Sequence, residues 1–179
     1  MPTTRFFTFT RNARLACLVT LLTLTCQPGL PARVLAQAAT VVQVLPAQSQ
    51  VNVDTTTTVS LNVIGGVDVN AFDLTILYNP SVVTLESWST GPYLSNLFEV
   101  KKEVQAGRIR LVYTQLATPG ANGDGVLLNL VFRGLAESQS DIILDEVIFA
   151  AHAGGMSYPT RENGVISVLP PQPATATPS

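Results

Sequence analysis

The sequence has few of the residues on which metal binding, disulfide formation and acid–base catalysis depend. It contains two cysteines and one histidine in 179 residues, and both cysteines, Cys17 and Cys26, lie near the N-terminus. A zinc site needs several Cys or His ligands, and a disulfide framework needs paired cysteines. His152 stands alone beside loop glycines, where a histidine is more often solvated than a general base. The sequence also lacks a G-x-S-x-G nucleophile motif. We therefore expect a protein that is not an enzyme and holds no metal or cofactor of its own.

Carboxylates do not form a recognisable catalytic or calcium-binding motif either. Glycoside hydrolysis needs two carboxylates that flank one bond. Asp145 and Glu146 are adjacent in a predicted strand, so we expect their side chains to point to opposite faces and not to flank one bond. Two short segments, Asp68–Asn70 and Asn122–Gly125, resemble fragments of a calcium loop. Neither completes the twelve-residue pattern that ends in Glu, and a turn explains the second segment better because of its glycines.

The first 38 residues are typical of a secretory signal peptide. Arginines precede a short apolar run, Leu15–Leu24, and a small-residue cleavage pattern follows at Ala36-Gln37-Ala38. The apolar run is shorter than the roughly 20 residues that a transmembrane helix needs. A lipoprotein acylated at Cys26 is the alternative, but the residues before it fit a lipobox poorly. We expect residues 1–38 to be removed and the protein to be secreted, with association to the cell surface left open.

Charge is sparse, and it becomes more acidic once that segment is removed. The whole chain has a net charge of −2, whereas cleavage would leave six Lys and Arg against twelve Asp and Glu, a net charge of −6. An acidic surface argues against nucleic acid or anionic lipid as the partner. The remaining 141 residues are the length of one domain.

From residue 40 onward, short β-rich segments alternate with turn residues, and their spacing predicts an all-β antiparallel sandwich. Gly65-Gly66 is expected to end one strand, and residues 118–125 and 152–163 are expected to be loops. Residues 126–135 fit a strand buried on both faces or a brief helix leading into one. Residues 39–169 would form the domain, and the Pro- and Thr-rich residues 170–179 an extended linker. The nine predicted strands cover residues 40–45, 57–64, 69–78, 82–88, 97–104, 108–116, 126–135, 141–151 and 164–169.

The segment VNAFDLTILYNPSVVTL, residues 69–85, is the most informative part of the chain. Its aromatic and apolar residues alternate with others up to Tyr78, which is the period of a strand with two different faces. Asn79-Pro80-Ser81 then interrupts the strand, because proline cannot donate a backbone hydrogen bond and Asn and Ser favour turns. One acidic residue, Asp73, lies on the face opposite the aromatic residues.

The order of these segments resembles that of a cohesin domain, the receptor module of cellulosome scaffoldins. The resemblance covers nearly all of residues 40–169 and rests on AFDLTILYNPSVVTLES with its Tyr-Asn-Pro corner, followed by GRIRLVYTQLA, GVLLNLVFRGL, DIILDEVIFAA and NGVISV. It implies a nine-stranded jelly-roll sandwich, similar to the family 2 and 3 carbohydrate-binding modules. It also implies a non-catalytic protein that binds dockerins, small calcium-loaded modules of secreted enzymes, through a flat sheet face with strand order 8-3-6-5. Any calcium involved would then belong to the dockerin.

The resemblance also indicates where a partner would bind. In type I cohesins the third strand presents an Asn and an Asp, two residues apart, to the dockerin. Counted from the Tyr-Asn-Pro corner, Asp73 matches the Asp, whereas Ala71 stands where the Asn would be. A face of mixed polarity suits a protein partner. By strand alternation, the predicted partner-binding residues are Asp73, Ala71, Thr75, Leu77, Arg110, Val112, Thr114 and Leu116.

Two other functions fit the same sandwich. A carbohydrate-binding module would stack sugars on exposed aromatic side chains, and the candidates are Trp88, Tyr93, Phe98, Tyr113 and Tyr158. For Trp88 a position in the core is the favoured interpretation. The second alternative is a structural domain of a surface protein. We expect binding of a dockerin-type partner in an extracellular, polysaccharide-degrading assembly, with direct binding of polysaccharide as the main alternative.

Overall fold

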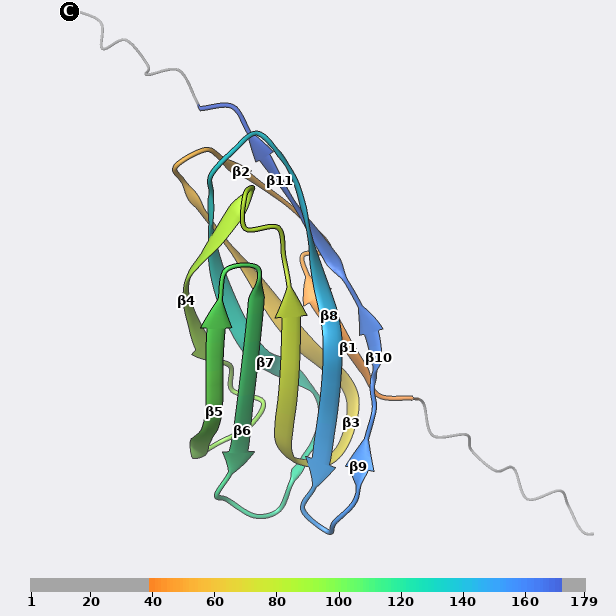
Figure 1. Cartoon of the computed structure of the whole chain (residues 1–179). Coiled ribbons are helices and arrows are strands. Elements are labelled where there is room, and N and C mark those ends of the chain that lie inside the picture. The colour runs from red at the N-terminus through yellow and green to blue at the C-terminus, as the bar shows by residue number, and fades with distance from the viewer. Residues whose placement is uncertain (1–38, 172–179) are drawn as a thin grey trace, which may run out of the picture. The chain divides into compact units, whose positions relative to one another are not determined.

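The computed structural model describes residues 39–171, and this part of the chain is built from β-strands (Figure 1). It contains no helix that is long and apolar enough to cross a membrane. The predicted signal peptide and all but the first two residues of the predicted linker lie outside the described residues. The strands are β1 Val41–Leu45, β2 Gln48–Asn52, β3 Thr56–Leu77, β4 Val83–Thr90, β5 Leu97–Gln105, β6 Arg108–Gln115, β7 Ala121–Gly134, β8 Ser138–Ala151, β9 Met156–Ser157, β10 Thr160–Glu162 and β11 Gly164–Leu169.

Strand β3 is 22 residues long and takes part in both layers of the sandwich. Its first half pairs with β1 and β7, and its second half pairs with β6 and β8. Register shifts surround Gly66, and Gly65 has a φ of 63°, so the strand bends here from one layer into the other. The prediction that Gly65-Gly66 ends a strand is therefore wrong. The glycines permit a bend within one strand.

The core lies between the two layers and consists of aliphatic and aromatic side chains. In Figure 1, β5, β6, the second half of β3 and β8 form the front layer, and β4 and β7 lie behind it. Tyr78 meets Phe132 edge-on, with ring centroids 5.3 Å apart. Each large apolar side chain contributes about 1.5–3 kcal/mol when it is fully buried. The largest fully buried side chains are Phe72, Phe132, Phe149, Leu61, Leu74, Ile76, Ile109, Leu111, Leu127, Leu128, Leu130 and Ile142.

The all-β sandwich is confirmed, but the prediction of a purely antiparallel arrangement of nine strands is wrong. Two strand pairs, β1 with β10 and β11 with β2, are parallel. Strand β2 was not predicted because its sequence, QSQVN, is largely polar; only Ser49 and Val51 are buried. Short strands β9 and β10 lie within the predicted loop 152–163, and β7 begins at Ala121, inside the predicted loop 118–125. Residues 126–134 of the segment 126–135 are strand, and none of the segment is helix.

Candidate functional site

The front layer has the strand order β8-β3-β6-β5, the order that the resemblance implied for the binding face. On β3, the buried Phe72, Leu74 and Ile76 alternate with residues that face outward. The cross-strand neighbours are Ala71 and Thr114, Asp73 and Val112, Thr75 and Arg110, and Leu77 and Arg108. The predicted site residues of β3 and β6 are thus brought together on the outer face. We call this surface, the outward side of β8-β3-β6-β5, the front face.

The corner after β3 fixes the register of this face. The side-chain oxygen of Asn79 accepts a hydrogen bond from Ser81 N at 3.0 Å. The backbone oxygen of Asn79 accepts hydrogen bonds from Val82 N and Val83 N, both at 3.1 Å. Tyr78 N donates to the oxygen of Gly107, at 3.0 Å, in the two-residue turn between β5 and β6. The corner and the β5–β6 hairpin are therefore connected, which fixes the register of β3 and β6 with Asp73 opposite Val112 and Thr75 opposite Arg110.

Asp73 is paired with an arginine on the neighbouring strand. The Nε and Nη2 atoms of Arg110 donate to the two carboxylate oxygens of Asp73, at 3.0 and 2.7 Å. This two-point geometry is the strong form of a charge-assisted hydrogen bond. The hydrogen bond to Asp73, with its negative charge, raises the pKa of Arg110 above its usual range. The carboxylate that the resemblance assigns to a partner is thus already occupied.

Thr75 is on the predicted face but is not available to a partner. Its neighbours across the sheet are Arg110 and Glu146, both with longer side chains, and Arg110 reaches past it to Asp73. Thr75 is therefore 0% exposed, and its prediction as a contact residue is wrong. At the other extreme, Leu116 lies just after β6 and is 71% exposed. The remaining predicted residues of the face are partly exposed.

A shallow apolar hollow lies beside Asp73. It has a volume of about 180 Å³, and it forms where the two small residues Ala71 and Ala150 lie opposite each other on β3 and β8. Ile148 and Met156 come from segments that the predicted site did not include. The alternation on β8 could have indicated Ile148 and Ala150, but Met156 belongs to a strand that was predicted as loop. The lining consists of Ala71, Phe72, Asp73, Val112, Ile148, Ala150 and Met156.

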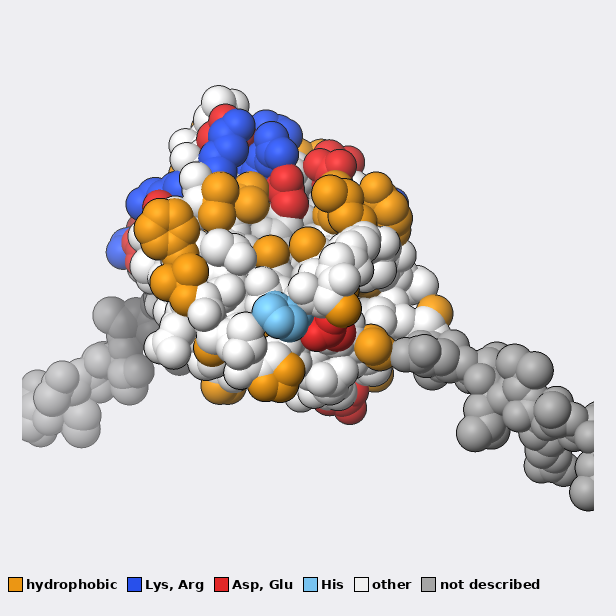
Figure 2. All heavy atoms as spheres, turned by 90° about the horizontal axis from the view of Figure 1, so that it is seen from below, with side chains coloured by type: hydrophobic (Ala, Val, Ile, Leu, Met, Phe, Trp, Pro, Cys, Tyr) orange, Lys and Arg blue, Asp and Glu red, His pale blue; other side chains and the backbone are white. Residues whose placement is uncertain are grey.

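The β5 side of the front face carries paired charges and an exposed ring. Glu103 lies 3.0 Å from Lys101 and 4.0 Å from Arg108, measured between charged atoms. The hydrogen bond from Lys101 lowers the pKa of the Glu103 carboxyl. Phe98, opposite Thr114, is 57% exposed. Figure 2 shows Lys and Arg side chains gathered along one margin of the molecule, with hydrophobic side chains next to them.

A β-bulge on β8 changes the expected arrangement of two carboxylates. The pairing with β3 shifts between Thr75, which faces Glu146, and Ile76, which faces Leu144, so Asp145 is the extra residue. Asp145 and Glu146 are both exposed and line one cleft of about 480 Å³. The prediction that they leave on opposite faces is therefore wrong, because a bulge interrupts the alternation. Arg161 donates to the backbone oxygen of Asp145.

Most of the candidate aromatic residues pack against the core. Trp88 and Tyr93 are partly buried against it, and Tyr113 is buried. Trp88 Nε1 donates to the Tyr113 hydroxyl at 3.5 Å, and that hydroxyl donates to Glu99 at 2.7 Å. Lys102 Nζ lies 4.6 Å from the centre of the Trp88 ring, a cation–π contact. Of the five candidates, only Phe98 and Tyr158 are exposed.

The two acidic segments that resembled calcium-loop fragments face each other and bind backbone amides. Asn122 accepts a hydrogen bond from Asp68 N at 2.9 Å, and Asp124 accepts one from Gly65 N at 2.7 Å. The Asp68 carboxylate accepts a bond from Ala153 N at 2.8 Å. Within residues 39–171, no three His, Cys, Asp or Glu residues are grouped so that they could hold a metal ion. These hydrogen bonds account for the polar side chains, but the turn interpretation of residues 122–125 is wrong, because they belong to β7.

Comparison with known proteins agrees with this geometry. A family model described as the cohesin domain matches residues 41–168, so the chain belongs to the cohesin family. Cohesin domains are non-catalytic binding modules, so the chain is not an enzyme. No curated protein matches the chain in sequence.

Solved structures with the same fold include cohesins crystallised alone and with dockerins. A non-cellulosomal cohesin from the archaeon Archaeoglobus fulgidus is 18% identical, with a TM-score of 0.64 over 74% of this chain and 92% of that one. The sixth cohesin of Acetivibrio cellulolyticus scaffoldin B, in complex with a Cel5 dockerin mutant, is 16% identical, with a TM-score of 0.61 over 73% and 99%. The OlpA cohesin of Clostridium thermocellum, in complex with Doc918, is 12% identical, with a TM-score of 0.63 over 73% and 99%. At these identities the likeness concerns the fold.

Proposed function

We propose that this cohesin domain binds a dockerin-type module through the front face. The observation that carries the proposal is the β8-β3-β6-β5 sheet, which presents Asp73, Val112 and Arg110 together on a partly exposed surface of mixed polarity. Crystallised relatives of the same fold occur in complexes with dockerins, which supports the choice of partner. Any calcium would be carried by the dockerin.

The protein acts, in this proposal, outside the cell in an assembly that degrades polysaccharide. The basic, then apolar, N-terminal segment and the Pro/Thr-rich C-terminal segment of the sequence support secretion and a spacer. Direct binding of polysaccharide has less support, because Trp88, Tyr93 and Tyr113 pack against the core and do not form an exposed platform.

The test is calorimetric titration of the protein with a panel of recombinant dockerins loaded with calcium. We expect at least one to bind, and Asp73→Ala to weaken that binding on the order of tenfold, since loss of the carboxylate leaves the Arg110 charge unpaired at the interface. Asp141→Ala is the matched control, because Asp141 is an exposed carboxylate on β8 at the end that pairs with β11. Equal binding by Asp73→Ala and wild type would show that the interface lies elsewhere.

A further inference from the structure

We infer that the front face selects a partner by accepting one apolar side chain into the hollow at Ala71, with acidic groups of the same partner meeting the β5–β6 hairpin. This inference rests on the proposed function and specifies the chemistry of the partner. Three observations carry it: the hollow, the prior pairing of most charged groups of the face, and the uneven distribution of charge.

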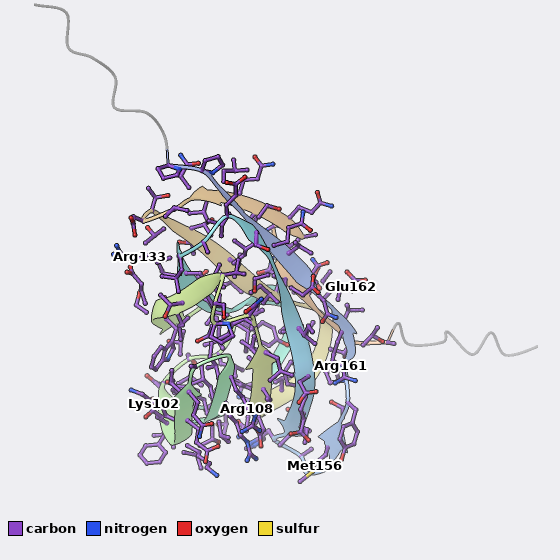
Figure 3. The ribbon with its side chains drawn as sticks, turned by 45° about the horizontal axis from the view of Figure 1, so that its top comes forward. Lys102, Arg108, Arg133, Met156, Arg161 and Glu162 are labelled. Atoms are coloured by element: carbon purple, nitrogen blue, oxygen red, sulfur yellow. The ribbon has the colours of Figure 1, made fainter. Side chains whose placement is uncertain are left out.

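The size and lining of the hollow fit a side chain better than a small molecule. Its volume of about 180 Å³ is below the roughly 300–1,000 Å³ of ligand pockets. The lining is apolar apart from the edge at Asp73. Met156, which is 71% exposed, forms one rim of the hollow and lies beside the end of β8 (Figure 3). An adaptable Met rim and a floor of two alanines suit a protruding aliphatic or aromatic group.

Most charged groups on this face are already paired within the domain, whereas Glu146, opposite Thr75 on β8, has no ion pair among the described residues. Asp73 is held at two points by Arg110, and Glu103 lies next to Lys101 and Arg108. A partner that bonded to Asp73 alone would have to compete with Arg110 for the carboxylate oxygens. Burial of apolar surface in the hollow requires no such exchange.

Charge is distributed unevenly over the domain. The β5–β6 hairpin carries Lys101, Lys102, Arg108 and Arg110 against Glu99 and Glu103, a net charge of +2. The rest of residues 39–171 carries two basic residues, Arg133 and Arg161, against ten acidic ones, a net charge of −8. Figure 3 shows Lys102 and Arg108 at the hairpin and Arg133 and Arg161 elsewhere on the molecule. The hairpin is thus the part of the surface that attracts an acidic group, and it lies beside the hollow.

The experiment uses the dockerins that bind the wild-type protein and two pairs of matched variants. Ala71→Leu fills the hollow, and Ser89→Leu adds a similar side chain to the exposed side of β4. Arg108→Gln and Arg133→Gln each remove one exposed positive charge and its contact with one glutamate. Thermal unfolding of each variant shows that the comparison is between folded proteins.

We expect Ala71→Leu to weaken binding on the order of tenfold and Ser89→Leu to leave it unchanged. We also expect Arg108→Gln, but not Arg133→Gln, to weaken binding. Raising NaCl from about 50 to about 500 mM should then lower the affinity of Arg108→Gln less than it lowers the affinity of wild type. The inference is overturned if Ala71→Leu binds as tightly as wild type, or if the two arginine variants behave alike. Failure of every dockerin to bind wild type would overturn the proposed function itself, which is a distinguishable result.

Discussion

Asp73 on β3 and Arg110 on β6 form a two-point ion pair, although the two residues are not directly opposite each other in the sheet. The residue directly opposite Asp73 on β6 is Val112, and the one opposite Arg110 on β3 is Thr75. Arg110 therefore crosses the sheet diagonally, and its Nε and Nη2 atoms lie 3.0 and 2.7 Å from the carboxylate oxygens. The pair covers Thr75, the β3 residue opposite Arg110, which is fully buried.

Thr75→Val is expected to stabilise the domain. Thr75 is fully buried, and its hydroxyl oxygen has no hydrogen-bond partner among the described residues. An unpaired buried hydroxyl costs about 1–3 kcal/mol, so replacing it with a methyl group should raise the free energy of unfolding by about 1 kcal/mol. Urea unfolding measures the change. Thr114→Val is the control, because Thr114 on the neighbouring strand β6 is partly exposed. A less stable Thr75→Val protein would show that the hydroxyl is satisfied, for example by a buried water.

Ala71→Asn is expected to change which partner binds. In the resemblance to type I cohesins an asparagine stands at this position, and here an amide would occupy the edge of the hollow. We expect binding of dockerins that recognise type I cohesins to strengthen about fivefold, the value of one added hydrogen bond. Binding of a partner that inserts an apolar side chain should weaken. Titration of the same dockerins against Ala71→Asn and wild type distinguishes these outcomes, and unchanged affinities for both would exclude position 71 from the interface.

The stability of the domain is expected to fall at alkaline pH through Tyr93. Burial, with a further contribution from the negative charge of Asp124, raises the pKa of Tyr93 to about 12, whereas a tyrosine in an unfolded chain has a pKa of about 10. Between these values the unfolded chain loses this proton before the folded domain does. The stabilisation is therefore complete below pH 10 and is lost as the pH rises to about 12.

Tyr93→Phe provides the test of this alkaline effect. The hydroxyl of Tyr93, like that of Thr75, is buried without a hydrogen-bond partner among the described residues, so Tyr93→Phe should raise the free energy of unfolding at neutral pH by about 1 kcal/mol. Between pH 10 and 11.5, urea unfolding should show a steeper loss of stability for wild type than for Tyr93→Phe. Parallel curves for the two proteins would contradict the assignment.

The amide of Asn122 is expected to act as a structural acceptor and not as a calcium ligand. Its oxygen accepts a hydrogen bond from Asp68 N at 2.9 Å, next to the bond that Asp124 accepts from Gly65 N. Asn122→Ala should lower the free energy of unfolding by about 1 kcal/mol. Added calcium should leave the melting temperature of the isolated domain unchanged. An increase in melting temperature with calcium in wild type, lost in Asn122→Ala, would indicate a metal site instead.

The sequence pattern was sufficient to predict the outward residues of strands that have one apolar face and one mixed face. In β3 and β6, buried apolar residues alternate with outward residues, so the Tyr78-Asn79-Pro80 corner and the hairpin turn at Gly107 were enough to place Asp73 on the face with Val112 and Arg110. The ion pair between Asp73 and Arg110 was not predicted, because it depends on a diagonal reach that alternation does not describe. The burial of Thr75 follows from the same reach.

The elements that were missed depend on tertiary contacts. The polar segment of β2 becomes a strand because β11 runs parallel to it and buries Ser49 and Val51. The bulge at Asp145 shifts the alternation in β8 by one residue, and no local signal marks it. Gly65-Gly66 resembled a turn because the same conformational freedom serves both a turn and a bend within a strand.

The long strand β3 has a consequence for how the domain opens. Since its two halves lie in different layers, neither layer can separate from the other without disrupting the hydrogen bonds of the same strand. Amide protons at both ends of β3 should then exchange with solvent only through global unfolding, at a common rate. Under tension, the domain would thus unfold as one cooperative unit and not layer by layer.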